Sequence, residues 1–206
     1  MTKNSVIIDT SVSPTNIEFP PNFNVSVPFI DRHLDEGRSE KIIIQSTSGE
    51  KVTYGQLFEK VNQSGNVLKN IGLNPGDRIL MVVKDSPEFF YLFWGAIKAG
   101  YIPVPLNTLF RSNDYAYIIE DSDCASVFYS PEFKNEVESA LAQVSRSPNH
   151  SCLTEGVSGS FLEKLQSASL ELDAVPASEN DDCFWLYSSG TTGKPKGVVH
   201  SHRDMV

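Results

Sequence analysis

The stretch TYGQLFEKVNQSGNVLKNIGLNPGDRILMVVKDSPEFFYLFWGAIKAGYIPVPL, residues 53–106, decides the fold of this sequence. It opens with the spacing of a capping box, because Thr53 is followed three residues later by Gln56. Apolar residues then recur at helical spacing until Gly72, and a turn of asparagine, proline and glycine follows. The sequence therefore predicts a helix that begins at Thr53 and ends at Gly72.

A strand and a second helix follow directly. Residues 78–84, RILMVVK, are almost continuously apolar, which is typical of a strand that helices cover on both faces of a parallel sheet. Ser86 and Pro87 mark a helix start, with an N-cap residue before a proline at the first helical position, and Gly100 ends that helix. Residues 101–106 then resume an extended path.

The same alternation extends in both directions. Residues 145–160 are rich in serine, proline, asparagine and glycine and predict a surface loop. The fold class that follows is α/β, with a mainly parallel sheet flanked by helices. The other expected elements are a helix over residues 28–37, a hairpin of strands 41–44 and 51–53, a helix starting at Ser112, a strand over 124–130, a helix over 131–144 and a strand over 183–188.

Composition excludes several classes of protein. The chain has 206 residues, with 17 Lys plus Arg against 26 Asp plus Glu and a net charge of −9. An acidic balance of this kind disfavours nucleic acid as a partner. The longest apolar run covers only residues 89–97, whereas a membrane-spanning helix needs about 20 residues, and the start of the chain lacks the apolar stretch of a signal peptide. We therefore expect neither a nucleic-acid nor a membrane partner.

Cysteine usage indicates a cytoplasmic protein. The three cysteines, Cys124, Cys152 and Cys183, are widely spaced and include no C-x-x-C pair. An odd number at such spacings fits neither a disulfide framework nor a zinc site. We expect three reduced and mostly buried thiols, and we assign no metal ligand.

One segment carries the candidate chemistry. Residues 187–197, YSSGTTGKPKG, follow directly on an expected strand. Glycines allow the backbone to approach a ligand closely, and backbone N–H groups in such a loop can form an anion-binding concavity. Four serine and threonine hydroxyl groups and two lysines add hydrogen-bond donors and positive charge. The segment therefore favours a polyphosphate-binding loop over a merely flexible, solvated one.

This segment differs from the two best-known glycine-rich phosphate motifs. A Walker A loop has four residues before its Gly-Lys pair, whereas only two separate Gly190 from Gly193, and Pro195 stands where that motif has Ser or Thr. The pattern G-x-G-x-x-G is not present in the segment either. Residues 197–200, GVVH, predict a strand, so we expect the phosphates to be held by a loop between two strands.

The segment YSSGTTGKPKGV resembles the phosphate-binding signature of the adenylate-forming superfamily, which includes acyl- and aryl-CoA synthetases, luciferases and nonribosomal-peptide adenylation domains. The stretches VTYGQL, FWGAIKAGYIPVPLNTLF and DYAYIIEDS extend the resemblance from residue 26 to the end of the chain. The sequence is most similar to the benzoate-CoA ligase group in four segments, IDRHLDEGR, FWGAIKAG, PLNTL and FWLYSSGTTGKPKGVVHSHRDM.

The resemblance implies an AMP-forming acid–CoA ligase that works in two steps. A carboxylic acid, expected to be aromatic, would attack the α-phosphate of ATP to give an acyl-adenylate and pyrophosphate. The thiol of coenzyme A would then form a thioester and release AMP, while Mg²⁺ would offset charge on the phosphates. ATP, Mg²⁺ and coenzyme A are thus the expected cofactors of a full-length enzyme, and ATP and a small carboxylic acid its partners.

The resemblance also implies which residues form the site. His202 stands where many relatives have a histidine, which implies a place at the rim of the acyl pocket. No catalytic residue is assigned, and the acids Glu120, Asp121 and Asp123 are expected to form a solvated helix end. The residues expected to bind the β- and γ-phosphates are Ser188, Ser189, Gly190, Thr191, Thr192, Gly193, Lys194 and Lys196.

Length is the main departure from the family. Relatives are more than twice as long, and Val206 comes just after the loop. The segments expected to bind adenine and ribose, the C-terminal domain and most of the acyl pocket would lie beyond it. We expect the partial N-terminal domain of such an enzyme, without ligase turnover alone. Benzoate-dependent pyrophosphate exchange by residues 1–206 would contradict this expectation.

Three parts are expected along the chain: an extended arm over residues 1–25, an α/β subdomain over 26–176, and a linker, strand and phosphate-binding loop over 177–206. Strand edges that await later segments would be exposed and could support self-association. Two alternatives stay open. A non-enzymatic binding module would retain only the scaffold, and a kinase-like enzyme, which the missing Walker A loop disfavours, would release ADP.

Overall fold

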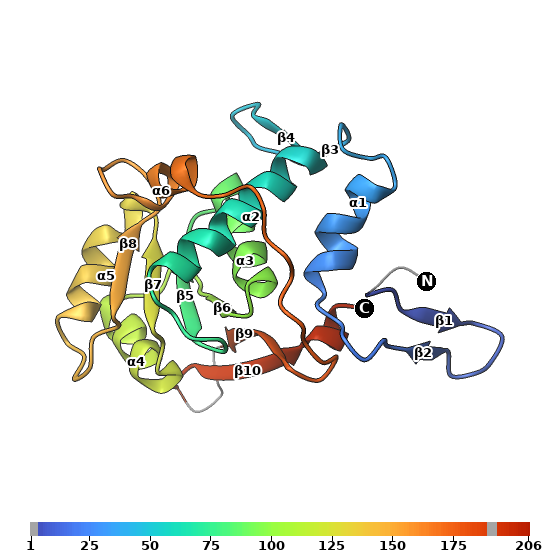
Figure 1. Cartoon of the computed structure of the whole chain (residues 1–206). Helices are drawn as coiled ribbons and strands as arrows, with labels where there is room; N and C mark the ends of the chain where they lie inside the picture. The colour runs from blue at the N-terminus through green and yellow to red at the C-terminus, as the bar shows by residue number, and fades with distance from the viewer. Residues whose placement is uncertain (1–3, 189–192) are drawn as a thin grey trace.

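A four-stranded parallel sheet, in the order β6-β5-β7-β8, forms the centre of the molecule (Figure 1). The structure is a computed structural model that describes residues 4–188 and 193–206. The strands are β1 (Ile7–Asp9), β2 (Asn16–Glu18), β3 (Ile42–Gln45), β4 (Lys51–Thr53), β5 (Arg78–Val82), β6 (Ile102–Pro105), β7 (Ser126–Tyr129), β8 (His150–Leu153), β9 (Asp182–Ser188) and β10 (Lys196–Ser201). The helices are α1 (Arg32–Asp35), α2 (Tyr54–Asn70), α3 (Pro87–Lys98), α4 (Ser112–Ser122), α5 (Lys134–Leu141) and α6 (Phe161–Ser167), with a π-helical turn at Val27–Asp31 and 3₁₀ turns at Pro131–Phe133 and His202–Met205.

Helices cover the sheet on both faces, which is why β5 is apolar and buried from Ile79 to Val82. Ile79 and Met81 point into the core that α2 and α3 complete, whereas Leu80 and Val82 point into a second core with α4 and α5. Figure 1 shows α2 and α3 on one side of the sheet and α4 and α5 on the other. This arrangement confirms the predicted α/β class with a mainly parallel, helix-flanked sheet.

The predicted start of α2 is confirmed in detail. The amide of Gln56 donates to Thr53 Oγ1 at 3.3 Å, and the amide of Thr53 donates to Gln56 Oε1 at 2.9 Å, so both halves of the capping box form. Further along, α2 crosses α3 closely at Gly95, where an added Cβ would lie 2.5 Å from Ser64 Oγ. Glycine at this position allows the two helices to pack as one layer.

A buried ion pair connects the N-terminal helical segment to α3. Lys98 is 0% exposed, and its Nζ lies 2.7 Å from Asp31 Oδ1 and over the ring of Phe58. Burial lowers the pKa of Lys98, and the charge of Asp31 offsets part of that shift. The apolar spacing of α3 does not reveal this pair, because Asp31 lies far away in the sequence.

The segment that precedes the π-helical turn is part of the core. Phe23 and Val25 are fully buried, and the amide of Phe23 donates to the carbonyl oxygen of Ala177. Between them, the Asn24 side chain donates to the carbonyl oxygens of Ile97 and Val175, each at 3.0 Å. Further toward the N-terminus, β1 and β2 form a hairpin that projects from the body (Figure 1).

One predicted loop contains a strand. Residues 145–160 were expected to form a surface loop, but His150–Leu153 forms β8, which pairs in parallel with β7 from Ser126 to Tyr129. The loop prediction is wrong for these four residues. Their sequence, HSCL, has neither an apolar run nor a clear alternation, since an edge strand takes its place mainly through backbone pairing with its neighbour.

The three cysteines are buried and free, as expected from their number and spacing. Burial raises the pKa of each thiol, to about 12 for Cys124 and Cys183, and so keeps the thiols protonated. Among the described residues, none of the helices is both long enough and apolar enough to cross a membrane.

Candidate functional site

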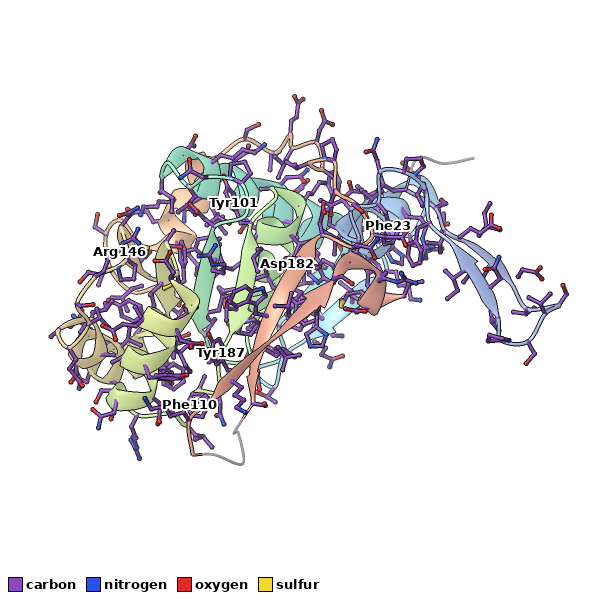
Figure 2. All side chains as sticks on the ribbon, turned by 90° about the horizontal axis from the view of Figure 1, so that it is seen from below. Phe23, Tyr101, Phe110, Arg146, Asp182 and Tyr187 are labelled. Carbon is purple, nitrogen blue, oxygen red and sulfur yellow. The ribbon has the colours of Figure 1, made fainter. Side chains whose placement is uncertain are left out.

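The candidate phosphate-binding segment connects the two strands of the β9–β10 hairpin. The strands are antiparallel, with Ser188 opposite Lys196 at the loop end and Asp182 opposite Ser201 at the other end. Figure 2 shows Tyr187 and Asp182 toward these opposite ends of the hairpin. The segment after β9 therefore leads into a strand, as GVVH predicts, and within the described residues the element that follows it is β10 and not a helix.

The structure describes part of the expected phosphate-binding set. Ser188, Gly193, Lys194 and Lys196 lie at the loop end of the hairpin and are all exposed. Gly193 has a φ of +90°, a backbone conformation that favours glycine. The expected binding residues Ser189, Gly190, Thr191 and Thr192 lie outside the described residues. The described members thus bring one hydroxyl and two ammonium groups to one end of the hairpin.

Tyr187 packs across the hairpin just before the loop. It pairs with Gly197 on the neighbouring strand, and a Cβ added to Gly197 would lie 3.1 Å from the Tyr187 ring. Glycine at this position lets the ring lie close to the opposite backbone. Burial, followed by the hydrogen bond to Asp121, raises the pKa of Tyr187 well above its usual range, so its hydroxyl remains a donor.

Helix α4 provides the contacts for this end of the hairpin. The Tyr187 hydroxyl donates to Asp121 Oδ2 at 2.7 Å, and the Tyr117 hydroxyl donates to Asp121 Oδ1 at 3.2 Å. Lys194 Nζ lies 4.8 Å from the centre of the Tyr117 ring. Asp121 is exposed, as expected for a helix end, but both of its oxygens have tyrosine partners. Sequence reasoning missed this role, and the only local signal was the spacing of Tyr117 and Asp121 on one helix face.

A second set of contacts holds β9 next to the central sheet. The Arg78 guanidinium lies 5.8 Å from the ring centre of Trp185 and donates to the carbonyl oxygens of Ser122 and Asp123. Strand β9 runs against β6, so the hairpin extends the layer of the parallel sheet without pairing with it. Arg78 thereby links β5, the end of α4 and the hairpin.

His202 lies at the other end of the hairpin from the loop. It follows β10 in a 3₁₀ turn and is only 4% exposed. Its Nδ1 accepts a hydrogen bond from the amide of Val25 at 3.1 Å. Burial lowers the pKa of His202, with a smaller opposing effect from Asp181. The neutral ring thus helps to hold the N-terminal segment, and its place at the rim of an acyl pocket stays a prediction.

Two hollows flank the scaffold away from the loop. The larger one, about 730 Å³, lies between the first helical segment, the β3–β4 hairpin and the start of α3, and the stacked rings of Phe29 and Trp94 form part of its wall. The other, about 540 Å³, is lined by Arg78, Tyr101 and His202 among others. Neither hollow includes the described phosphate-binding residues.

A family model described as AMP-binding enzyme matches residues 31–206, which include the whole hairpin. The chain belongs to the AMP-binding enzyme family. This membership confirms the resemblance that the segment YSSGTTGKPKGV carries.

Two of the relatives that this AMP-binding chain matches are named as ligases for benzoate or hydroxybenzoate. It is 36% identical over 202 residues to a benzoate–CoA ligase of Thauera aromatica, a match that covers 97% of this chain and 38% of the relative. It is 38% identical over 183 residues to a 4-hydroxybenzoate–CoA/benzoate–CoA ligase of Rhodopseudomonas palustris, with 88% and 34% covered. The chain thus spans about a third of the length of these relatives and corresponds to their N-terminal portion.

Solved structures show the same relation. An anthranilate CoA ligase, AuaEII, in complex with anthranoyl-AMP matches with a TM-score of 0.83 and 31% identity, over 90% of this chain and 36% of that one. A benzoate CoA ligase from Burkholderia xenovorans LB400 matches with a TM-score of 0.77 and 31% identity, over 88% and 35%. The AMP-binding chain therefore has the fold of the N-terminal part of adenylate-forming CoA ligases.

Proposed function

We propose that this chain provides the ATP-phosphate-binding hairpin and supporting scaffold of an AMP-forming ligase that joins an aromatic carboxylic acid to coenzyme A. The observation that carries the proposal is the loop end of the β9–β10 hairpin, where Lys194, Lys196 and Ser188 are exposed and Lys196 pairs with Ser188 across the two strands. Membership of the AMP-binding enzyme family and the relatives that act on benzoate support the same function.

The chemistry of the described donors fits a polyphosphate. Lysine ammonium groups provide charge-assisted hydrogen bonds to phosphate oxygens, and the serine hydroxyl adds a neutral donor. All of these side chains are exposed in an acidic chain, so the lysines form a local positive site. In this role they would hold the β- and γ-phosphates and offset charge that develops when the α-phosphate is attacked.

The described residues do not fit a resident metal site. In residues 4–188 and 193–206, no group of three or more His, Cys, Asp and Glu side chains could hold a metal ion. Asp121, the carboxylate near the loop, already accepts hydrogen bonds from two tyrosines. We therefore assign Mg²⁺ to the ATP that binds, and derive no step that this chain would carry out through the metal.

Calorimetric titration of the chain with MgATP and with inorganic tripolyphosphate tests the phosphate-binding role. We expect binding that weakens as salt rises, because exposed charges are screened. Lys194→Ala and Lys196→Ala should each weaken it. Lys51→Ala, which removes an exposed lysine on β4, is the matched control and should bind as the original chain does. Equal affinity in all four proteins would contradict the assignment.

A chimaera tests the ligase part of the proposal. The corresponding N-terminal portion of the Thauera benzoate–CoA ligase would be replaced by this chain. We expect benzoate-dependent pyrophosphate exchange by the chimaera and none by the chain alone. A folded chimaera that binds MgATP but shows no exchange with benzoate or hydroxybenzoates would contradict a ligase scaffold.

An association module is the second candidate, and the exposed side of the hairpin favours it. Within the described residues β10 pairs only with β9, and Leu186, Val198 and Val199 are 41–48% exposed. Two copies of the chain could pair their β10 edges in antiparallel fashion, centred between Val198 and Val199. Lys196 of one copy would then lie opposite Ser201 of the other copy, and not opposite a second lysine. Light scattering should then show a dimer that Val198→Lys converts to a monomer, whereas a monomer at all concentrations would contradict this candidate.

A further inference from the structure

Both ends of the candidate phosphate loop contact the same turn of α4. Before the loop, the Tyr187 hydroxyl donates to Asp121 Oδ2 at 2.7 Å. After it, Lys194 Nζ lies 4.8 Å from the centre of the Tyr117 ring. Tyr117 and Asp121 are four residues apart on α4 and are joined by a hydrogen bond of 3.2 Å. Tyr117 and Asp121 therefore form a single contact surface for Tyr187 and Lys194, which we call the α4 seat.

The charge of Lys194 already has a partner in the ligand-free structure. An ammonium group over an aromatic face is attracted by the negative face of the ring. The Asp121 carboxylate, hydrogen-bonded to the same tyrosine, adds negative charge on this turn of α4. Burial and the hydrogen bond to Asp121 raise the pKa of Tyr117, so the ring remains a neutral phenol. Among the expected phosphate-binding residues that the structure describes, Lys194 is the one with a ring contact of this kind.

We propose that the α4 seat is the resting position of Lys194, and that a polyphosphate binds by drawing Lys194 from the Tyr117 ring onto its own oxygens. Tyr117 and Asp121 are then positioning residues, which act on the phosphate through Lys194 and Tyr187. The inference rests on the proposed phosphate-binding function and adds a competition within that site.

The direction of this competition follows from the strengths of the two contacts. A charge-assisted hydrogen bond to phosphate is stronger than an exposed cation–π contact, so the exchange proceeds when phosphate is present. Lys194 must nevertheless give up the ring contact, so the seat lowers the affinity for polyphosphate. The hydrogen bond of Tyr187 to Asp121 does not involve Lys194 and can persist, which keeps the start of the loop at α4 while its end changes partner.

Nuclear magnetic resonance of the chain tests the seat directly. Protons on the Lys194 Cε should show an upfield ring-current shift because they lie near the Tyr117 ring. The shift should persist in Tyr117→Phe, which keeps the ring, and disappear in Tyr117→Leu. Saturation with inorganic tripolyphosphate should remove it from the original chain as well. A missing shift in the ligand-free chain would overturn the proposal.

Calorimetry with tripolyphosphate tests the competition. Tyr117→Leu should bind roughly two- to fivefold more tightly than the original chain, since the ring contact no longer competes. The gain should vanish when Tyr117→Leu is combined with Lys194→Ala, because the lysine is the group that is released. Tyr54→Leu, which removes a tyrosine stacked on His33 elsewhere, is the control for loss of an aromatic ring and should bind like the original.

The outcomes separate this inference from the proposed function. Tight binding of tripolyphosphate with a ring-current shift that persists at saturation would overturn the exchange and leave phosphate binding intact. The exchange would also be overturned if Tyr117→Leu bound tripolyphosphate no more tightly than the original chain. Phosphate binding would still stand if Lys194→Ala bound it more weakly. If the chain binds no tripolyphosphate at all, the proposed function itself fails, whatever the ligand-free spectrum shows.

Discussion

Strands β5 and β10 are both rich in β-branched or aliphatic residues, yet they have opposite environments. In β5, Ile79 to Val82 are buried, and the strand pairs with β6 on one side and β7 on the other. In β10, residues 196–199 are exposed, and the described residues provide one neighbour, β9. The difference teaches that β5 is enclosed on both faces and at both edges, whereas in the hairpin that carries the candidate site β9 contributes buried residues and β10 is left exposed.

The buried ion pair should show the largest effect. Asp31→Ala leaves the Lys98 ammonium buried without a partner, and we expect the free energy of unfolding to fall by about 3–5 kcal/mol. Urea denaturation followed by circular dichroism measures this change. The matched control is Asp31→Leu with Lys98→Met, which replaces both charges by apolar groups and should recover most of the loss. A double variant as unstable as Asp31→Ala would show that the penalty does not come from the unpaired lysine.

Truncation of one residue in each strand compares the two environments directly. Leu80→Ala opens a cavity in β5, where the side chain is 0% exposed, and should cost about 2–5 kcal/mol of unfolding free energy. Val198→Ala in β10 removes a side chain that is 45% exposed and should change it by less than about 0.5 kcal/mol. Similar losses in the two variants would mean that β10 is covered in solution, as the association module requires.

Alkaline pH should weaken the scaffold. Burial raises the pKa of Tyr91 and of Tyr115 from 10.0 to about 12. The folded state therefore holds these protons more tightly than the unfolded state, so their contribution is complete below pH 10 and is lost as pH rises toward 12. We expect a loss of about 1 kcal/mol for each tyrosine at pH 11.

Thermal melting across this pH range, with phenolate absorbance recorded in parallel, measures the alkaline effect. Tyr115→Phe should reduce the dependence on pH, although it also removes the hydrogen bond that the hydroxyl donates to Asn107. A melting temperature that stays constant from pH 9 to pH 11 would contradict the role of these buried phenols.

The smallest effect should come from the contact between the hairpin and α4. Tyr187→Phe removes the hydrogen bond to Asp121, which is worth about 1 kcal/mol. Amide hydrogen exchange in β9 and β10 should accelerate, because opening of the hairpin needs less energy, while exchange in β5 stays unchanged. Faster exchange in β5 as well as in β9 and β10 would show that the hairpin and the scaffold unfold together.

The regular part of the fold could be predicted because its signals are local. The capping box at Thr53 lies within four residues, and the apolar run of β5 reports directly on a strand covered on both faces. Strand β8 was not predictable in this way, because His150–Leu153 owes its conformation to pairing with β7. A fourth strand at the sheet edge needs a backbone partner more than an apolar pattern of its own.

The candidate site likewise has a part that local sequence predicts and a part that depends on distant contacts. The residue types and spacing of YSSGTTGKPKG were enough to predict a phosphate-binding segment, because glycines, hydroxyls and lysines act through their own chemistry, and the family that the segment resembles is confirmed. The partners of the segment were not visible in that spacing. Tyr187 meets Asp121 from 66 positions away, and Lys194 meets Tyr117 only after the hairpin folds back against α4.

Spacing along the chain was therefore sufficient to predict the α/β fold class, the helix start at Thr53 and the family to which the loop sequence belongs. The folded chain was needed for the α4 seat, for the burial of His202 beside Val25 and for the exposure of β10. The physical reason is that propensity, capping and donor chemistry act between residues close in sequence. Burial and partner choice depend on which distant segments a strand or helix happens to face.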